Sequence, residues 1–239
     1  MLDPTLVLFL AVAIFLALTV HEYAHAKLAD AAGDPTPRIY GRVTLNPMAH
    51  LDPMGAIMIL FTVMSGFGIG WGKPVPMDPR KMRNPRWDWF AAVLAGPVSN
   101  ILMAALAGIV FRLVGGYAGL GSVATFLHLF VLINISLFLF NLIPIGPLDG
   151  QWLLGLLLPE SARDKWFWWN RRYGWMLMLG LVFLSQFARS GGMAQLDVIG
   201  TYLAPSARFL ERNLIGPPPI QMQEVPERRD SGGDGGESI

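Results

Sequence analysis

The stretch Thr19-Val20-His21-Glu22-Tyr23-Ala24-His25-Ala26 decides how the rest of the chain must be arranged. On a helix, His21 and His25 are four residues apart, so both imidazoles leave the same face, one turn from each other. The run from Leu6 to Val20 before them carries no charge and is typical of a membrane span. Ionisable side chains are costly inside a span and usually mark a functional site. We therefore expect a membrane helix from about Thr5 to about Ala32 with a functional site near its end.

Two neutral imidazoles at this spacing can hold one zinc ion. Glu22 lies one residue round from His21, where it can reach a water on the metal but is badly placed to be a third ligand. This is the His-Glu-x-x-His pattern of zinc peptidases. Polar residues of a membrane helix that hydrogen-bond to neighbouring helices are the alternative reading. The chain has no cysteine, so a zinc ion here must be held by nitrogen and oxygen atoms.

A catalytic zinc usually has three protein ligands, so a third side chain must come from elsewhere. We expect Asp149, because it follows an apolar span and lies between Pro147 and Gly150, where a turn can aim a carboxylate inward. His128 would lie near the far side of its helix, and we expect it to be a polar packing residue. His50 either contacts the substrate or stabilises a local turn, and both interpretations stay open.

Composition indicates an all-α polytopic membrane protein. Of the 239 residues, 53% are hydrophobic and only 15% are charged, well below the share in soluble proteins. The formal net charge of +1 provides no general attraction for nucleic acid, so we expect no nucleic-acid partner. A soluble metalloprotease with apolar core helices is an alternative that the span lengths disfavour.

Apolar segments predict a core of three transmembrane helices around the zinc site, with further segments packed beside them. The expected spans are 5–32, 87–114 and 122–143, followed by two C-terminal helices near 175–187 and 198–210 that form either two spans or one span and an interfacial helix. Residues 38–45 alternate weakly and predict a short β-hairpin or extended loop. We expect one membrane domain over residues 1–215, with its core at 5–158, and a disordered tail at 216–239 that is rich in Pro, Gly and charge.

Charge placement predicts the orientation in the membrane. His21 and Asp149 can share a metal only if the chain crosses the membrane an even number of times between them. If Met54–Gly72 enters and returns as a re-entrant segment, the basic loop Lys73–Arg86 and the belt Lys165–Arg172 fall on one face. By the positive-inside rule this face is cytoplasmic. We therefore expect a multi-pass protein of the cell membrane, its N-terminus outside and its active site toward the cytoplasmic side.

Several blocks, in order, resemble the site-2 protease family of intramembrane zinc metalloproteases, in a short prokaryotic form without PDZ or cystathionine-β-synthase-like domains. They are His21-Glu22-Tyr23-Ala24-His25, Gly96-Pro97-Val98-Ser99-Asn100 and Asn141-Leu142-Ile143-Pro144 running to Leu148-Asp149-Gly150. The resemblance implies that His21, His25 and Asp149 bind one zinc ion and that Glu22 is the catalytic acid and base. It also implies that Asn100 and Asn141 assist at the substrate.

The expected partners are the lipid bilayer and a transmembrane protein substrate. A helical substrate must unwind before cleavage, because each carbonyl in a helix is hydrogen-bonded. Addition of the unwound segment as a strand beside residues 38–45 is one hypothesis. Asn100 and Asn141 can each stabilise an oxyanion or simply join helices in lipid. The competing function is a zinc-binding membrane protein without proteolytic activity, such as a transporter or an assembly factor, in which Glu22 would matter little.

Overall fold

The structure, a computed structural model, describes residues 3–65, 70–118, 121–193 and 197–216, and within these ranges it contains helices and no strand. The α-helices are α1 Pro4–Ala31, α2 Thr36–Ile39, α3 Pro47–His50, α4 Pro53–Ser65, α5 Trp87–Leu113, α6 Gly121–Asn141, α7 Asp149–Leu157, α8 Glu160–Trp169, α9 Trp175–Ser190 and α10 Val198–Ile215. Two 3-10 turns, η1 Pro79–Lys81 and η2 Gly116–Ala118, and a π-helical turn, η3 Asn170–Gly174, complete the described elements.

Three helices, α1, α5 and α6, are long and apolar enough to cross a membrane. The shortest, α6, has 21 residues and is therefore about 31 Å long, close to the thickness of the hydrocarbon core. Their ends lie within two residues of the spans expected at 5–32, 87–114 and 122–143. The prediction of an all-α fold with a core of three helices that could span a membrane is confirmed.

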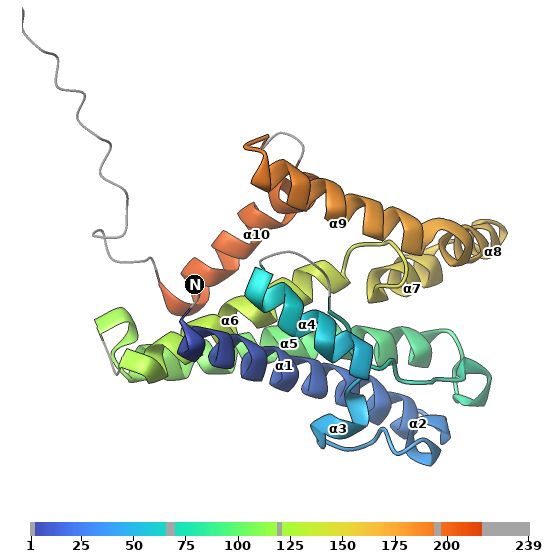
Figure 1. Cartoon of the computed structure of the whole chain (residues 1–239). Coiled ribbons are helices and arrows are strands. Elements are labelled where there is room, and N and C mark those ends of the chain that lie inside the picture. Colours follow the sequence, from blue (N-terminus) through green and yellow to red (C-terminus); the bar gives the residue numbers. More distant parts are fainter. Residues whose placement is uncertain (1–2, 66–69, 119–120, 194–196, 217–239) are drawn as a thin grey trace, which may run out of the picture.

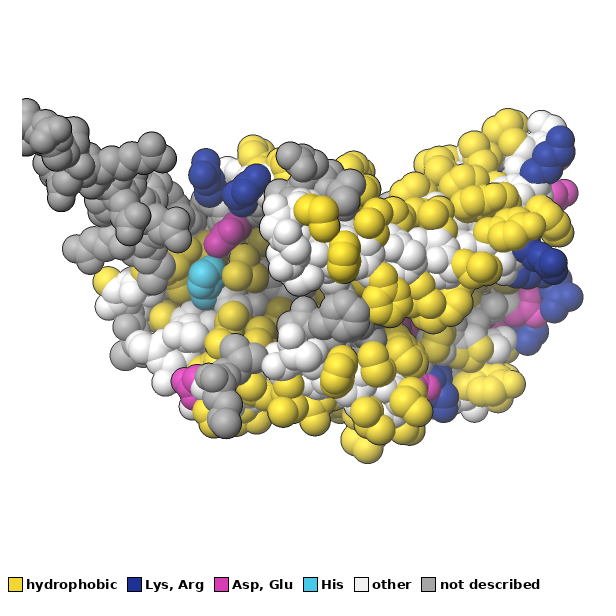
Figure 2. Space-filling model, turned by 45° about the horizontal axis from the view of Figure 1, so that its top comes forward, with side chains coloured by type: hydrophobic (Ala, Val, Ile, Leu, Met, Phe, Trp, Pro, Cys, Tyr) yellow, Lys and Arg dark blue, Asp and Glu magenta, His cyan; other side chains and the backbone are white. Residues whose placement is uncertain are grey.

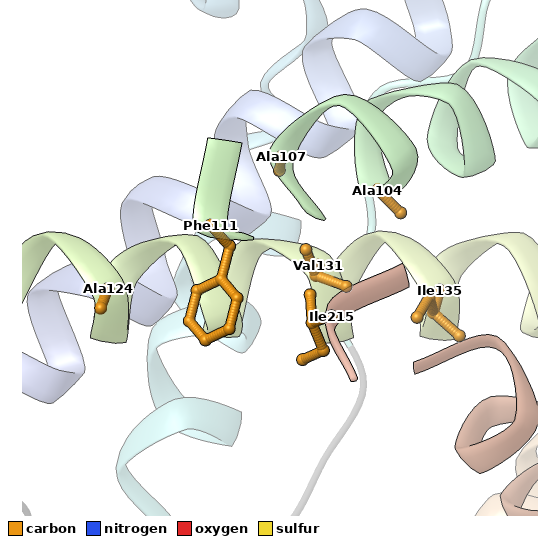
Figure 3. Packing of buried hydrophobic residues seen from close by; sticks show 7 residues of the cluster. All are labelled: Ala104, Ala107, Phe111, Ala124, Val131, Ile135 and Ile215. Carbon is orange, nitrogen blue, oxygen red and sulfur yellow. The ribbon is translucent and has the colours of Figure 1, made fainter. Parts of the chain in front are cut away.

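The central helix is α5, which packs against both α1 and α6, and the three lie side by side (Figure 1). Small buried residues such as Ala92, Gly96 and Ala104 let the neighbouring backbones approach closely, as is usual between helices in lipid. At the other end of α5, Phe111 packs into a cluster with residues of α6 and with Ile215 of α10 (Figure 3). The cluster joins α10 to the three-helix core.

The outward faces of these helices are apolar. On α5, Leu106 is 64% exposed and Leu113 is 80% exposed. Figure 2 shows hydrophobic side chains spread along the face in view, with Lys and Arg side chains gathered at the end occupied by α8 and in a smaller group toward the other end. An apolar exterior of this extent is characteristic of a surface that contacts lipid.

Residues 38–45, for which a short hairpin or an extended loop was expected, form no hairpin but a helical turn and a loop. Pro37 stands in the first turn of α2 and Pro47 in that of α3, positions for which the fixed backbone angle of proline is already suited. The Asn46 side chain accepts a hydrogen bond from the Met48 amide and caps α3. The Arg42 guanidinium then binds the carbonyls of Ala49, Lys73 and Pro74. Local capping therefore outweighs the weak strand pattern.

The chain that follows α4 returns to the place from which α4 starts. The Lys73 amide donates a 2.8 Å hydrogen bond to the carbonyl of His50, on the other side of α4 in sequence. A Cβ on Gly55 would collide with the Trp71 carbonyl, so the two segments pack against each other directly. This is the path expected of a re-entrant segment over residues 54–72, of which 66–69 lie outside the described residues.

A short loop that includes η1 then connects this segment to α5 and is attached to the end of α1. The buried Asp34 carboxylate accepts hydrogen bonds from the amides of Thr36 and Asp78, and the Arg83 amide donates to the Ala32 carbonyl. A hydrogen bond from Arg80 holds the pKa of the Asp78 carboxyl below its usual range. The C-terminal end of α1 and the N-terminal end of α5 thus lie together.

The two expected C-terminal helices are confirmed as α9 and α10. They follow α8 and η3 and lie on one side of the α1, α5 and α6 core (Figure 1). The division into a membrane domain and a tail stays a prediction, since residues 217–239, where the tail was expected, lie outside the described residues.

Candidate metal centre

The α1 helix presents two buried imidazoles on one face. His21 and His25 are each 4% exposed, and their rings meet edge to face with centroids 4.6 Å apart. The Nε2 atoms of the two rings are 3.0 Å apart. The Nδ1 atom of His25 lies 2.8 Å from the Ala92 carbonyl, which can only accept a hydrogen bond. In the neutral ring the proton of His25 is therefore on Nδ1, and Nε2 offers a lone pair to the site.

Asp149 brings the third ligand atom to these imidazoles. It is the first residue of α7, after the turns at residues 142–148 that follow α6. Its Oδ2 atom lies 3.2 Å from Nε2 of His21 and 3.3 Å from Nε2 of His25. The turn is tight, because a Cβ on Gly150 would lie 2.5 Å from the Leu142 carbonyl oxygen. The expected meeting of the His pair with Asp149 is therefore present in the fold.

The donor set fits a zinc ion. Ligand atoms from His21, His25 and Asp149 all lie within 4.8 Å of one another, and the buried Asp149 Oδ2 has no hydrogen-bond partner. Three electron-pair donors that converge in this way repel one another unless a cation lies between them. Tetrahedral zinc with nitrogen or oxygen ligands at about 2.1 Å separates them by about 3.4 Å. The observed separations of 3.0 to 3.3 Å are close to that requirement.

Three residues of α5, spaced four apart, contact the two imidazoles on the side away from the cavity. Ala92 accepts the hydrogen bond of His25, and Asn100 Oδ1 lies 2.6 Å from Nδ1 of His21. Between them, Gly96 lies directly against the rings. A Cβ at this position would collide with His25 and would lie 2.8 Å from Cε1 of His21.

A cavity of about 770 Å³ opens in front of the metal site. Glu22 lines it beside His21 and His25, and its carboxylate has no hydrogen-bond or ion-pair partner among the described residues. Asn141 also lines the cavity, and its amide donates to the Leu137 carbonyl one turn earlier on α6. Most of the remaining wall is apolar, from residues 70–79 on one side and from α6, α7 and α9 on the other.

The two other histidines lie away from the cavity. His128 contacts Glu211 of α10 at 3.1 Å and packs beside Phe111 and Tyr117, in agreement with the expected packing role. His50 is buried, and its Nε2 atom lies 2.8 Å from the Thr44 carbonyl. His50 therefore stabilises the local turn and does not line the cavity.

Asn100 is buried and does not line the cavity, whereas Asn141 does. Their predicted roles at the substrate stay predictions. Two residues that carry polar contacts around the site were not identified from the sequence. Asn134 on α6 binds Asn100, and Asn170 of η3 binds the Gly146 amide in the turn before Asp149. The available signal for Asn134 was a polar residue in the middle of an apolar span.

Known proteins are similar to this chain in sequence. The model of "Peptidase family M50" matches residues 115–185, a range that includes Asn141 and Asp149. The chain is 37% identical over 164 residues to YwhC of Bacillus subtilis (strain 168), named as a candidate zinc metalloprotease, and the alignment covers 66% of the chain and 72% of that protein.

Rip2 of Mycolicibacterium smegmatis and Rip2 of Mycobacterium tuberculosis, also named as candidate zinc metalloproteases, are 30% and 31% identical to the chain over 152 residues. These alignments cover 62% of the chain but only 57% and 56% of the two Rip2 proteins. No solved structure shows a significant match to the chain.

Proposed function

Because the chain belongs to peptidase family M50, the family of the site-2 proteases, we propose that it is an intramembrane zinc metalloendopeptidase that hydrolyses peptide bonds within or near transmembrane segments of other membrane proteins. The observation that carries the proposal is the meeting of His21, His25 and Asp149 at the wall of a cavity that Glu22 also lines. A site for zinc alone would not need an unpartnered carboxylate beside it.

In this proposal the residues of the chain have separate tasks. His21, His25 and Asp149 hold the zinc ion, which when bound supplies Lewis acidity toward water and the scissile carbonyl. Glu22 accepts a proton from the attacking water and returns it to the leaving amine, a role typically worth about 10²–10⁴-fold in rate. Asn141, on the cavity wall, contacts the substrate backbone. The apolar part of the wall limits the entry of bulk water.

The substrate segment must be extended when it is cut, because a helix hides its carbonyls in hydrogen bonds. Residues 38–45, the docking strand of the hypothesis above, contain no strand, and the Arg42 side chain binds the carbonyls of Ala49, Lys73 and Pro74 outside this range. Residues 70–77 form most of one cavity wall without regular secondary structure, and we place the unwound segment beside them.

The protein is a membrane protein, and we propose that it is multi-pass with the active site toward the cytoplasmic face. Two observations support this arrangement: the C-terminal end of α1 lies beside the N-terminal end of α5, and the chain returns to the start of α4 after this helix. The basic loop 73–86 and the metal site then belong to the same half of the molecule. We further propose that the substrate is a transmembrane protein.

The deciding experiment is Glu22→Gln in the purified full-length protein, assayed for bound zinc and for cleavage of candidate single-span proteins in vesicles. We expect the variant to keep its zinc, because Glu22 is not a ligand, and to lose at least about 100-fold in cleavage rate. Glu160→Gln, which neutralises an exposed carboxylate in the first turn of α8, is the matched control and should cleave normally. Normal cleavage by Glu22→Gln would favour a zinc-binding protein without proteolytic function.

A further inference from the structure

We propose that Asn134 is a positioning residue of the metal centre: through Asn100 it determines which nitrogen of His21 carries the proton and thereby turns the other nitrogen toward the metal. The inference rests on the proposed function only through the bound zinc, not through cleavage. Asn134 does not line the cavity, so its effect must pass through other side chains.

A chain of three hydrogen bonds leads from the backbone of α6 to His21. The Asn134 amide Nδ2 donates to the Phe130 carbonyl at 2.8 Å. The Asn134 Oδ1 atom accepts from the Asn100 Nδ2 atom at 3.0 Å. The Asn100 Oδ1 atom then lies 2.6 Å from the Nδ1 atom of His21. Asn100 and Asn134 are both 0% exposed, so water cannot replace any of these partners.

The donor and the acceptor of each hydrogen bond in this series follow from the first bond, between Asn134 and the Phe130 carbonyl. The Phe130 carbonyl can only accept, so the NH2 group of Asn134 must face it and the oxygen of Asn134 must face Asn100. That oxygen can only accept, so Asn100 presents its NH2 group to Asn134 and its own oxygen to His21. His21 must then donate from Nδ1. In the neutral ring Nε2 is left with a lone pair directed at His25 and Asp149.

Without Asn134, no other contact among the described residues would prevent the reverse arrangement. An Asn100 amide turned over would offer its NH2 group to Nδ1 of His21 and would favour the proton on Nε2, where the metal must bind. In the native chain this flip would place two buried oxygens against each other at Asn134 with no donor between them, which is costly. Metal-binding histidines commonly donate their second nitrogen to a carbonyl or carboxylate, and loss of such a partner typically weakens metal binding about 10–100-fold.

The first test is the zinc affinity of Asn134→Leu, measured by competition with a chelating dye on the full chain in detergent. We expect an affinity loss of about 10–100-fold. The matched control is Asn213→Leu, which removes the same kind of amide bond to a carbonyl one turn earlier, but on α10 and away from the metal. It should leave the affinity unchanged. Cobalt(II) bound in place of zinc should change its visible spectrum in Asn134→Leu and not in the control.

Testing Asn134→Leu in a second variant distinguishes an effect on the orientation of the Asn100 amide from an effect on helix packing. In Asn100→Asp both side-chain oxygens are acceptors, so there is no amide left to turn over. Adding Asn134→Leu to this background should change zinc affinity by less than about twofold, the range expected for uncoupled positions. An equal loss in both backgrounds would show that Asn134 acts through packing and would overturn the inference.

If these substitutions prevent folding, the position of the His21 proton can be measured in the native protein by NMR. The chain has only four histidines, so ¹⁵N labelling of their rings gives few signals. In zinc-free native protein at a pH where the rings are neutral, we expect the His21 proton on Nδ1. A proton on Nε2 would overturn the inference. If native protein binds no zinc, the proposed function itself fails. If it binds zinc and cleaves substrate while Asn134→Leu keeps full affinity, only this inference fails.

Discussion

At the scale of single residues, the metal site depends on one face of α5. Ala92, Gly96 and Asn100 follow one another at intervals of four, so they line up toward α1. The outer two accept hydrogen bonds from the two rings, and the middle one leaves room for them. Glycine is needed there because both rings occupy the volume that any Cβ would fill.

Replacing this glycine should damage metal binding. In Gly96→Ala the new methyl group would collide with His25, so the rings must move apart from the positions that converge on Asp149. We expect zinc affinity to fall by at least about 10-fold and stability by about 1–3 kcal/mol from overpacking. Zinc content and thermal unfolding of the purified variant measure the two effects.

The matched control is Gly180→Ala on α9, where a Cβ would meet nothing within 4 Å. Alanine is the better helix former, so this variant should keep its zinc and gain about 0.5–1 kcal/mol. Equal zinc content in both variants would show that the rings can shift without cost.

At the scale of elements, the position of Asp149 depends on a π-helical turn beyond α8. The Oδ1 atom of the buried Asn170 accepts a 2.9 Å hydrogen bond from the Gly146 amide, in the turn that leads into α7. Gly174, at the other end of η3, lies so close that a Cβ on it would be 2.9 Å from the same amide nitrogen. π-Helical turns are frequent at functional sites, and this one holds the loop that carries a metal ligand.

Removal of the hydrogen bond between Gly146 and Asn170 should make the position of Asp149 less well fixed. Asn170→Ala leaves the Gly146 amide without its buried acceptor, which we expect to cost about 1–3 kcal/mol of stability and to weaken zinc binding. Asn213→Ala is the control. Both asparagines donate to a carbonyl four residues earlier, but only Asn170 also accepts a hydrogen bond from the Gly146 amide in the turn before α7. Unaltered zinc affinity in Asn170→Ala would mean that α7 alone holds Asp149 in place.

The cavity wall at residues 70–77 offers a second test at this scale. The Val75 amide donates no hydrogen bond within the described residues and lies on the wall, where an extended substrate can accept from it. Val75→Pro removes this donor, so cleavage should slow while zinc content stays the same. Val75→Ala keeps the donor and should cleave at nearly the native rate. Equal rates for the two variants would exclude pairing at this amide.

At the scale of the whole molecule, the three long helices expose apolar side chains along their length, and the metal site lies nearer one end of the bundle. In α1, His21 comes 17 residues after Pro4, or about 26 Å along a helix of about 42 Å. His21 is therefore closer to the C-terminal end of α1 than to its start. The proposed orientation makes this end cytoplasmic.

The absence of cysteine allows a direct test of orientation, since a single introduced thiol is then the only one. Ser122→Cys, at the start of α6, should react with a membrane-impermeant maleimide on intact cells. Lys81→Cys in the basic loop and Ser161→Cys on α8 should react only after the membrane is permeabilised. The opposite labelling would reverse the proposed topology, and labelling of Lys81→Cys and Ser161→Cys from different sides would exclude it altogether.

The sequence by itself predicted the three long helices and the three residues that meet at the candidate metal site. Long apolar runs specify helices that could span a membrane, and a spacing of four puts His21 and His25 on one face. Asp149 was the best-placed candidate for the third ligand, because it lies in a turn after an apolar span. The hairpin at 38–45 failed because proline and asparagine at helix starts outweigh a weak alternation. Only the tertiary structure decided the contacts behind the site, those of Gly96, Asn134 and Asn170. The reason is physical: α1, α5 and α6 are apolar on nearly every side, so their patterns do not specify how each helix is rotated about its axis, and that rotation decides which polar side chains meet.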